Sequence, residues 1–283
     1  MRVINSVDEM QHEAERLRLA GNRIGLVPTM GYLHEGHLSL MQEARRSSDI
    51  VIVSIFVNPT QFGPAEDLSR YPRDMERDKE LATRSGVDLL FVPDATGMYP
   101  GDFETYIEAQ EASRILEGKF RPTHFRGVTT VVAKLFNICK PHISVFGQKD
   151  AQQVFIVRKM VRDLNFDVSI VVLPIVREKD GLAMSSRNVY LSKEERKNAA
   201  ALRESLMFAE QKIRNGATDV RRLHQEMTEL ILAKGSPSID YIAFVDPATF
   251  RETDVVSNSA VLVALAVRFG NTRLIDNAVI PVG

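Results

Sequence analysis

The sequence predicts an α/β protein in which a Rossmann-like, doubly wound, mostly parallel sheet is followed by a smaller α+β domain. Short apolar runs alternate with helical segments along the first part of the chain, a pattern typical of parallel sheets with helices on both faces. The run at residues 50–57, IVIVSIFV, is almost continuously apolar, as expected of a strand that is buried on both faces. Further along, two charged helical segments precede three strand-like segments, which is the order of an α+β domain.

The elements of the first domain, predicted over residues 1–180, follow from these runs and from their periodicity. Five short apolar runs predict strands, at residues 24–27, 50–57, 87–92, 143–146 and 168–172. Segments with helical spacing or high charge between them predict helices, at residues 38–45, 74–84, 128–139 and 151–164. In such a sheet, ligands bind outside the carboxyl ends of the strands, near the point where the strand order reverses.

The second domain is predicted over residues 181–283, after Asp180-Gly181. Two charged amphipathic helices are expected at residues 193–215 and 218–234, separated by Asn215-Gly216. Strands are expected at residues 239–245, 260–267 and 273–276, with turn residues between them. We expect this smaller domain to close over the active site.

Composition excludes several classes of protein. The 283 residues are enough for one large domain or two ordinary ones, and the formal net charge of −1 argues against a nucleic-acid surface. No apolar run is long enough to cross a membrane. Met1–Ser6 lacks an apolar signal core, so we expect a cytoplasmic protein. Cys139 is the only cysteine and is interpreted as a small buried apolar residue in a reducing compartment.

The turn Pro28–His37, PTMGYLHEGH, joins the first predicted strand to the first predicted helix. Free backbone N–H groups and the positive end of the helix dipole meet there, so the turn suits a phosphate. His34 and His37 share one face of a first helical turn, and each can donate a hydrogen bond to a phosphoryl oxygen. Two other interpretations are a helix cap and a metal site; no third metal ligand is evident nearby, so we expect no protein metal site.

Two further clusters suit phosphate. Gly147-Gln148-Lys149-Asp150 follows the strand at residues 143–146, where Lys149 can meet a phosphate and Asp150 can bind ribose hydroxyls or cap the next helix. Met184-Ser185-Ser186-Arg187 offers two hydroxyl groups and a guanidinium at the domain boundary. Taken alone, the first could be an ordinary cap with a solvated lysine, and the second a polar interdomain loop. Together with the histidine turn, they indicate an enzyme that uses ATP.

Other polar residues follow strands or lie near these clusters. Gln61 and Gln153 are neutral amides that could hold a small polar substrate, although each could also be a surface residue. Arg121, His124 and Arg126 form a basic group for which a structural role is slightly favoured over an anionic ligand or an interface.

The combination of motifs is more specific than any one of them. The His34–His37 sequence matches the HxGH pattern of the nucleotidyltransferase superfamily, and residues 184–187 resemble its mobile phosphate-binding loop. The segments PTMGYLHEGH, SIFVNPTQF, YPR, RPTHFRGVTTVVAKLF, FGQKDAQQ and DGLAMSSRNVYL occur in this order. In order and spacing they resemble the pantothenate synthetase (pantoate–β-alanine ligase) family, and residues 274–277, LIDN, also fit. One departure is Gln148, where many relatives carry Glu.

The resemblance implies an ATP-dependent ligase that condenses pantoate with β-alanine through a pantoyl adenylate, releasing AMP and pyrophosphate. It also implies Mg²⁺ bound with ATP and a cytoplasmic homodimer with small-molecule substrates. The implied catalytic residues are His37, His34, Lys149 and Arg187, and Gln61 and Gln153 would bind pantoate, with Gln61 also facing β-alanine. The ATP site would consist of Met30, Gly31, Tyr32, Leu33, His34, Glu35, Gly36, His37, Gly147, Gln148, Lys149, Asp150, Val176, Met184, Ser185, Ser186 and Arg187.

Three rival functions share some of these features. An adenylyl- or cytidylyltransferase would leave the nucleotide on its product and release no AMP. A class I aminoacyl-tRNA synthetase is disfavoured because the chain is not basic and lacks an evident anticodon-binding segment. A nucleotide sensor that retained the fold would bind ATP without turning it over.

Overall fold

The computed structural model describes residues 1–64, 66–256 and 259–282. Its strands are β1 (Arg2–Ile4), β2 (Ile24–Thr29), β3 (Ile50–Ile55), β4 (Leu89–Phe91), β5 (Ile143–Gly147), β6 (Ser169–Leu173), β7 (Ser238–Val245), β8 (Ala260–Phe269) and β9 (Thr272–Pro281). Its α-helices are α1 (Val7–Leu19), α2 (Glu35–Ser47), α3 (Met75–Arg84), α4 (Ala95–Met98), α5 (Glu117–Phe120), α6 (His124–Cys139), α7 (Ala151–Asp163), α8 (Lys193–Asn198), α9 (Ala201–Arg214) and α10 (Val220–Leu232). Short 3₁₀ helices are η1 (Pro59–Gln61), η2 (Leu68–Arg70), η3 (Gln148–Asp150) and η4 (Ser186–Tyr190).

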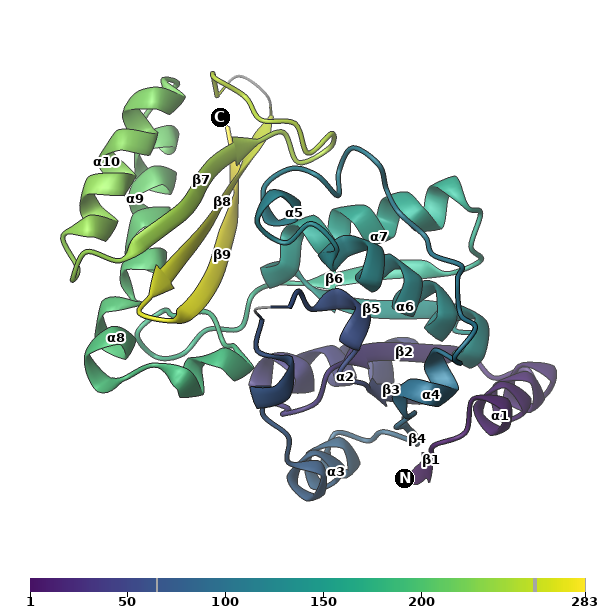
Figure 1. The fold of residues 1–283 in the computed structure, drawn as a ribbon. Helices are drawn as coiled ribbons and strands as arrows, with labels where there is room; N and C mark the ends of the chain where they lie inside the picture. Colours follow the sequence, from purple (N-terminus) through teal and green to yellow (C-terminus); the bar gives the residue numbers. More distant parts are fainter. Residues whose placement is uncertain (65, 257–258, 283) are drawn as a thin grey trace. The chain divides into compact units, whose positions relative to one another are not determined.

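The chain forms two compact units (Figure 1). The first comprises Met1–Gly147 and Gln153–Pro174, and the second comprises Gln148–Gln152 and Ile175–Gly283. The short segment Gln148–Gln152 therefore belongs, by its contacts, with the C-terminal part of the chain, although it follows β5 directly.

The first unit contains a six-stranded parallel sheet in the order β1-β4-β3-β2-β5-β6, which confirms the predicted fold class. From β2 the chain winds through β3 to β4 on one side, and through β5 to β6 on the other. The strand order therefore reverses between β2 and β5, and the carboxyl ends of these two strands lie side by side. By the general rule for such sheets, this is where a ligand binds.

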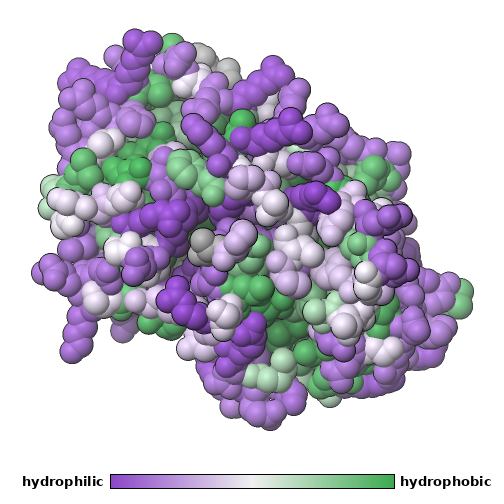
Figure 2. Space-filling view, in the orientation of Figure 1, coloured by the Kyte–Doolittle hydropathy of each residue, from purple (hydrophilic) through white to green (hydrophobic). Residues whose placement is uncertain are grey.

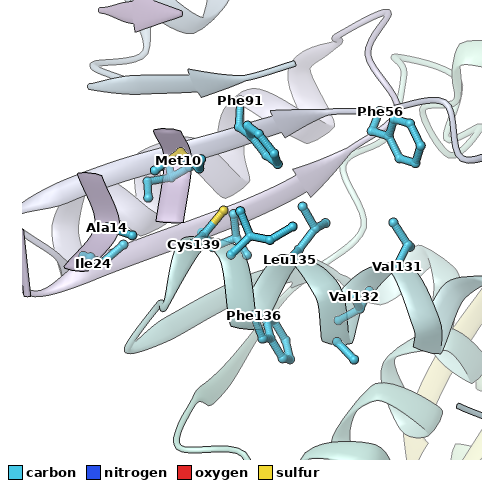
Figure 3. Packing of buried hydrophobic residues seen from close by; sticks show 14 of the residues in the cluster. Met10, Ala14, Ile24, Phe56, Phe91, Val131, Val132, Leu135, Phe136 and Cys139 are labelled. Carbon is cyan, nitrogen blue, oxygen red and sulfur yellow. The ribbon is translucent and has the colours of Figure 1, made fainter. Parts of the chain in front are cut away.

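Both faces of this sheet are covered, because successive strand residues point to opposite sides. Ile52 packs in one apolar cluster with residues of α1, α6 and α7, whereas Val51 and Val53 pack in another with residues of α2 and α3. Figure 3 shows the first cluster, in which Leu135 and Cys139 project from α6 toward the strands. Cys139 is fully buried there, which confirms its interpretation as a small core residue, and burial raises the pKa of its thiol.

The second unit has an antiparallel sheet in the order β7-β8-β9, as predicted for an α+β unit. Its core forms where apolar side chains of this sheet pack with buried residues of α9 and α10, among them Leu206 and Met227. The last strand is longer than the predicted 273–276, since pairing with β8 continues from Thr272 to Pro281.

Two sequence-based expectations about helices were incomplete. The predicted helix at residues 193–215 is two helices, α8 and α9, with Ala199 and Ala200 between them. The N-terminal β1 and α1 were not predicted, because β1 has only three residues and α1 buries only Met10, Ala14 and Leu17 among many charged residues. The start of α1 was nevertheless signalled by its N-cap Ser6, whose hydroxyl accepts a hydrogen bond from the Glu9 N–H.

Figure 2 shows one face of the molecule, on which hydrophilic residues predominate and apolar residues gather in a few patches between them. Among the described residues, the helices are all too short or too polar to cross a membrane.

Candidate functional site

The turn after β2 has an unusual backbone conformation. Gly31 and Tyr32 are consecutive residues with positive φ, 82° and 50°. A left-handed backbone conformation costs free energy at Tyr32, because its side chain makes this conformation less favourable than it is for glycine. An added Cβ on Gly31 would lie 2.9 Å from Ile55 Cγ2 and 3.0 Å from Asp78 Oδ2, so the position also demands a small residue. The Thr29 hydroxyl, at the end of β2, accepts a hydrogen bond from the Gly31 N–H at 3.2 Å.

The strained turn is held by a buried carboxylate from α3. Asp78 Oδ2 accepts from the Tyr32 N–H and Oδ1 from the Leu33 N–H, each at 2.7 Å. Burial raises the pKa of the Asp78 carboxyl, and its hydrogen bonds from Leu33 and Tyr32 oppose that shift. The ionised form accepts both N–H groups without a proton of its own, so we infer that Asp78 fixes the backbone that leads into the histidine pair. Sequence reasoning missed Asp78, because it lies in a charged helix.

Replacing Asp78 with asparagine should misplace this turn. The amide keeps the shape, but its NH₂ group would face a backbone N–H, so one of the two hydrogen bonds is lost. We expect the free energy of unfolding to fall by about 1–3 kcal/mol. We also expect the rate of the ATP-dependent reaction that the resemblance implies to fall about 10²-fold, because a displaced catalytic group loses its alignment. Urea unfolding and pyrophosphate–ATP isotope exchange would measure the two effects.

Asp74→Asn is a matched control for this prediction. Asp74 is the exposed N-cap of the same helix and accepts from the Arg77 N–H, a role that asparagine fills equally well. Equal losses of exchange in both variants would contradict a specific role for Asp78.

The histidine pair begins α2. His34 is the N-cap, and its Nδ1 accepts from the Gly36 N–H at 3.2 Å. His37 Nδ1 accepts in return from the His34 N–H at 3.3 Å, which completes a capping box. The two imidazoles stack with ring centroids 4.0 Å apart. Because Nδ1 of each ring accepts an N–H, the ring nitrogen that can act as a donor is Nε2.

The cap and the phosphate interpretations of this pair are therefore compatible. Nδ1 of each histidine satisfies the backbone at the start of α2, and the capping box does not use Nε2 of either ring. Protonating Nδ1 would replace an acceptor with a donor and break the capping box. Glu35, the first residue of α2, is exposed, and Gly36 and His37 are half-buried.

Gln61 is buried beside this turn. Its Nε2 lies 3.1 Å from the Met30 sulfur, and its Oε1 accepts from Asn58 Nδ2 at 3.1 Å. Asn58 is itself fixed, since its Oδ1 accepts from the Tyr99 hydroxyl and its Nδ2 also donates to the Gly127 carbonyl. The structure thus brings a predicted substrate residue into contact with the predicted ATP turn. Sequence reasoning missed Asn58, although an Asn-Pro pair after a strand is a signal of a structured turn.

The basic group around the start of α6 has structural partners, in line with the interpretation that the sequence slightly favoured. Arg121 pairs with Glu66 at 2.6 Å, and Arg126 stacks on the Tyr106 ring at 3.8 Å. His124 Nδ1 lies 3.0 Å from the Gln61 carbonyl oxygen and must donate to it. Arg121 Nη2 also donates to this carbonyl at 3.4 Å, so Arg121 and His124 hold the backbone of Gln61.

The remaining predicted residues of the first unit lie near the ends of β5 and α7. Gly147 is the last residue of β5, the strand next to β2 where the strand order reverses. A Cβ added to Gly147 would meet no other atom within 4 Å. Gln153 lies in the first turns of α7 and is half-buried.

The second unit contains the other predicted ATP residues, on two segments. Gln148, Lys149 and Asp150 form η3 and are half-buried. The second segment is a hairpin in which the Met184 N–H donates to the Val176 carbonyl at 3.0 Å. Ser185 follows and caps η4 by accepting from the Arg187 N–H at 3.3 Å, and Ser186 is buried.

In the part of the chain that the structure describes, no group of three or more His, Cys, Asp or Glu side chains is placed to hold a metal ion.

A parallel sheet with a glycine-rich turn and a histidine-capped helix N-terminus, at the point where the strand order reverses, defines a Rossmann-like α/β protein. The sequence model of the pantoate-beta-alanine ligase family matches residues 2–279. The chain belongs to this family of enzymes, which are ligases.

Individual relatives match over the whole chain. The pantothenate synthetase of Acetivibrio thermocellus is 53% identical over 282 residues, covering 100% of both chains. That of Caldicellulosiruptor bescii is 54% identical over 280 residues, covering 99% of each. Among solved structures, pantothenate synthetase from Thermus thermophilus superposes with a TM-score of 0.93, at 45% identity over 98% of this chain and 99% of that one. Pantoate-beta-alanine ligase from Francisella tularensis, complexed with beta-gamma ATP and beta-alanine, gives a TM-score of 0.82 at 35% identity, covering 98% and 97%.

Proposed function

We propose that this protein condenses pantoate with β-alanine in two steps driven by ATP. In the first, an oxygen of the pantoate carboxylate attacks the α-phosphorus of ATP, the bond to the β-phosphate breaks, and pyrophosphate leaves. In the second, the β-alanine nitrogen attacks the carbonyl carbon of the pantoyl adenylate, the bond to the phosphoryl oxygen breaks, and AMP leaves. The nitrogen loses a proton, and the product is pantothenate.

The adenylate solves a chemical difficulty. A free carboxylate is a poor acylating agent because its leaving group would be oxide, whereas AMP is a good leaving group. No protein nucleophile is required, since the substrate carboxylate attacks directly. Catalysis then depends on alignment and on donors aimed at the charge that develops on the phosphoryl oxygens.

The capping geometry of the histidine pair is the observation that carries this proposal. It turns Nε2 of each ring into the donor atom at the N-terminus of α2, where the strand order of the sheet reverses, in a family whose Francisella tularensis member has been solved with beta-gamma ATP and beta-alanine. We propose that His37 and His34 donate to the phosphates, and that the turn Met30–Gly36 and Gly147 line the nucleotide. Lys149 and Arg187 add positive charge, while Gln148, Asp150, Val176, Met184, Ser185 and Ser186 complete the ATP site.

Several finer features belong to the same proposal. Gln61 and Gln153 bind pantoate, and Gln61 also faces β-alanine. Mg²⁺ arrives with ATP and is held mainly by phosphate oxygens, since a hard cation with few protein ligands behaves in this way. Exclusion of water while the reactive adenylate exists is the role we assign to the C-terminal domain predicted over residues 181–283. The active form is a homodimer in the cytoplasm.

One assay tests the function. AMP formation from ATP that requires both pantoate and β-alanine supports the ligase. Pyrophosphate release without AMP would favour an adenylyl- or cytidylyltransferase. ATP binding without turnover would favour a nucleotide sensor.

The pantoate site predicts a selective kinetic effect. Gln61→Ala and Gln153→Ala each remove a neutral amide, so we expect the KM for pantoate to rise about tenfold or more, with a smaller change for ATP. Steady-state kinetics with each substrate varied in turn would measure this. An unchanged pantoate KM in both variants would remove these residues from the substrate site.

A further inference from the structure

Two adjacent polar residues are buried in the middle of β9. Asp276 and Asn277 pair in register with Leu265 and Ala264 of β8, and their exposed fractions are 1% and 3%. A carboxylate and an amide at such positions cost free energy unless their hydrogen-bonding groups are satisfied. The partners that satisfy them belong to the two segments of this unit that carry predicted ATP residues.

Asn277 holds the backbone of η3. Its Nδ2 donates to the Gln148 carbonyl at 3.0 Å and to the Lys149 carbonyl at 2.9 Å. In return, Gln148 Nε2 donates to Asn277 Oδ1 at 3.1 Å. One buried amide therefore fixes two successive peptide groups at the base of the Lys149 side chain. The side chain of Gln148 is occupied by this pairing.

Asp276 holds the second segment through Arg177. Its carboxylate, whose side chain is 0% exposed, accepts from both terminal nitrogens of the guanidinium, at 2.6 and 2.9 Å. Arg177 forms a β-bridge with Ala183 and donates to the Gly181 carbonyl at 3.0 Å. The hairpin that leads into Ser185–Arg187 is thus fixed to β9.

We propose that Asp276 and Asn277 are positioning residues that hold the two ATP-binding segments of the C-terminal unit in one arrangement. They act through Arg177 and through the backbone of Gln148 and Lys149, and do not themselves contact the nucleotide. This inference rests on the proposed function in that it takes both segments to bind ATP. Asn277 holds η3 and Asp276 holds the hairpin, so both segments are fixed to adjacent positions of one strand.

Asn277→Ala, Asn277→Asp and Asp276→Asn test the proposal, with ATP binding measured by calorimetry without pantoate. Asn277→Ala removes both donors to the carbonyls, so we expect the Kd for ATP to rise about tenfold. Asn277→Asp is closer in shape but turns a carboxylate toward those carbonyls, so ATP should bind more weakly still. If Asn277 only filled space, Asn277→Asp would change the Kd for ATP less than Asn277→Ala. Asp276→Asn should also weaken ATP binding, while the pantoate KM of each active variant stays within about twofold of wild type.

Asp240→Asn is the matched control. Asp240 on β7 has a carboxylate side chain that is 8% exposed, and it accepts from Arg268 Nε at 3.1 Å and Arg273 Nε at 2.6 Å, which lie on β8 and β9 and not on an ATP segment. It should lower the thermal unfolding midpoint and leave the Kd for ATP unchanged. If the Asp276 and Asn277 variants fail to fold, Arg177→Lys provides a milder test, because the Arg177 side chain is 19% exposed. Lysine cannot form the two-point pairing with Asp276, so this variant should also weaken ATP binding.

Wild-type affinity for ATP in Asn277→Ala and Asp276→Asn, or an equal loss in Asp240→Asn, would overturn the positioning role. If the Asn277 and Asp276 variants do not fold, wild-type affinity for ATP in Arg177→Lys would overturn the positioning role. Failure of the proposed function is separate. A wild-type protein that binds ATP but forms no AMP would refute the ligase, while the binding measurements would still decide the role of β9.

Discussion

His37→Ala is expected to lower pyrophosphate–ATP isotope exchange, measured with pantoate present, by about 10²- to 10³-fold, the usual cost of removing one donor to developing charge. We assign the His37 Nε2–H as this donor at the N-terminus of α2, and the ring is held by the capping box through Nδ1. The same substitution removes the acceptor for the His34 N–H, so we also expect the free energy of unfolding to fall by about 1 kcal/mol.

A second variant separates these two effects. Glutamine at the third position of a helix reaches back to the N-cap N–H, so His37→Gln should keep the stability of wild type while losing most of the exchange. Near-normal exchange in His37→Ala would count against the assignment of His37. Full activity in His37→Gln would show that capping, and not the imidazole, is the contribution of this residue.

Lys149→Ala is the second substitution with a large expected effect. Its ammonium group is the charge that we assign to the phosphates from η3, in a segment whose carbonyls are fixed by Asn277. Loss of that charge should again cost about 10²- to 10³-fold in the isotope exchange. The backbone partners of η3 are untouched, so the thermal unfolding midpoint should stay close to that of wild type.

Lys159→Ala provides the control. Lys159 lies on α7, which follows η3 in the chain, and pairs with Asp163 at the helix surface. An exposed pair of this kind contributes little, so exchange should be unchanged. Wild-type exchange in the Lys149→Ala variant would remove Lys149 from the reaction, whatever its effect on ATP affinity. The assignment of the other ATP residues stays a prediction until such variants are measured.

Local patterns in the sequence were sufficient for the fold class. Buried parallel strands such as β3 appear as continuous apolar runs, and α6 appears as an apolar periodicity, because burial imposes a pattern on neighbouring residues. α1 and the division between α8 and α9 were missed because little of α1 is buried and no Pro or Gly marks the break at Ala199 and Ala200.

The sequence by itself also determined where the candidate site residues would lie along the chain: His34 and His37 at a helix start, Lys149 after a strand, and Ser185 to Arg187 in a loop, part of which forms η4. Tertiary structure alone decided what holds them. Asp78 is 46 residues from Tyr32, and Asn277 is 129 residues from Gln148. A buried polar side chain is stabilised by partners that the fold brings to it from distant positions. Nothing in its local sequence distinguishes it from a polar residue that is exposed to water.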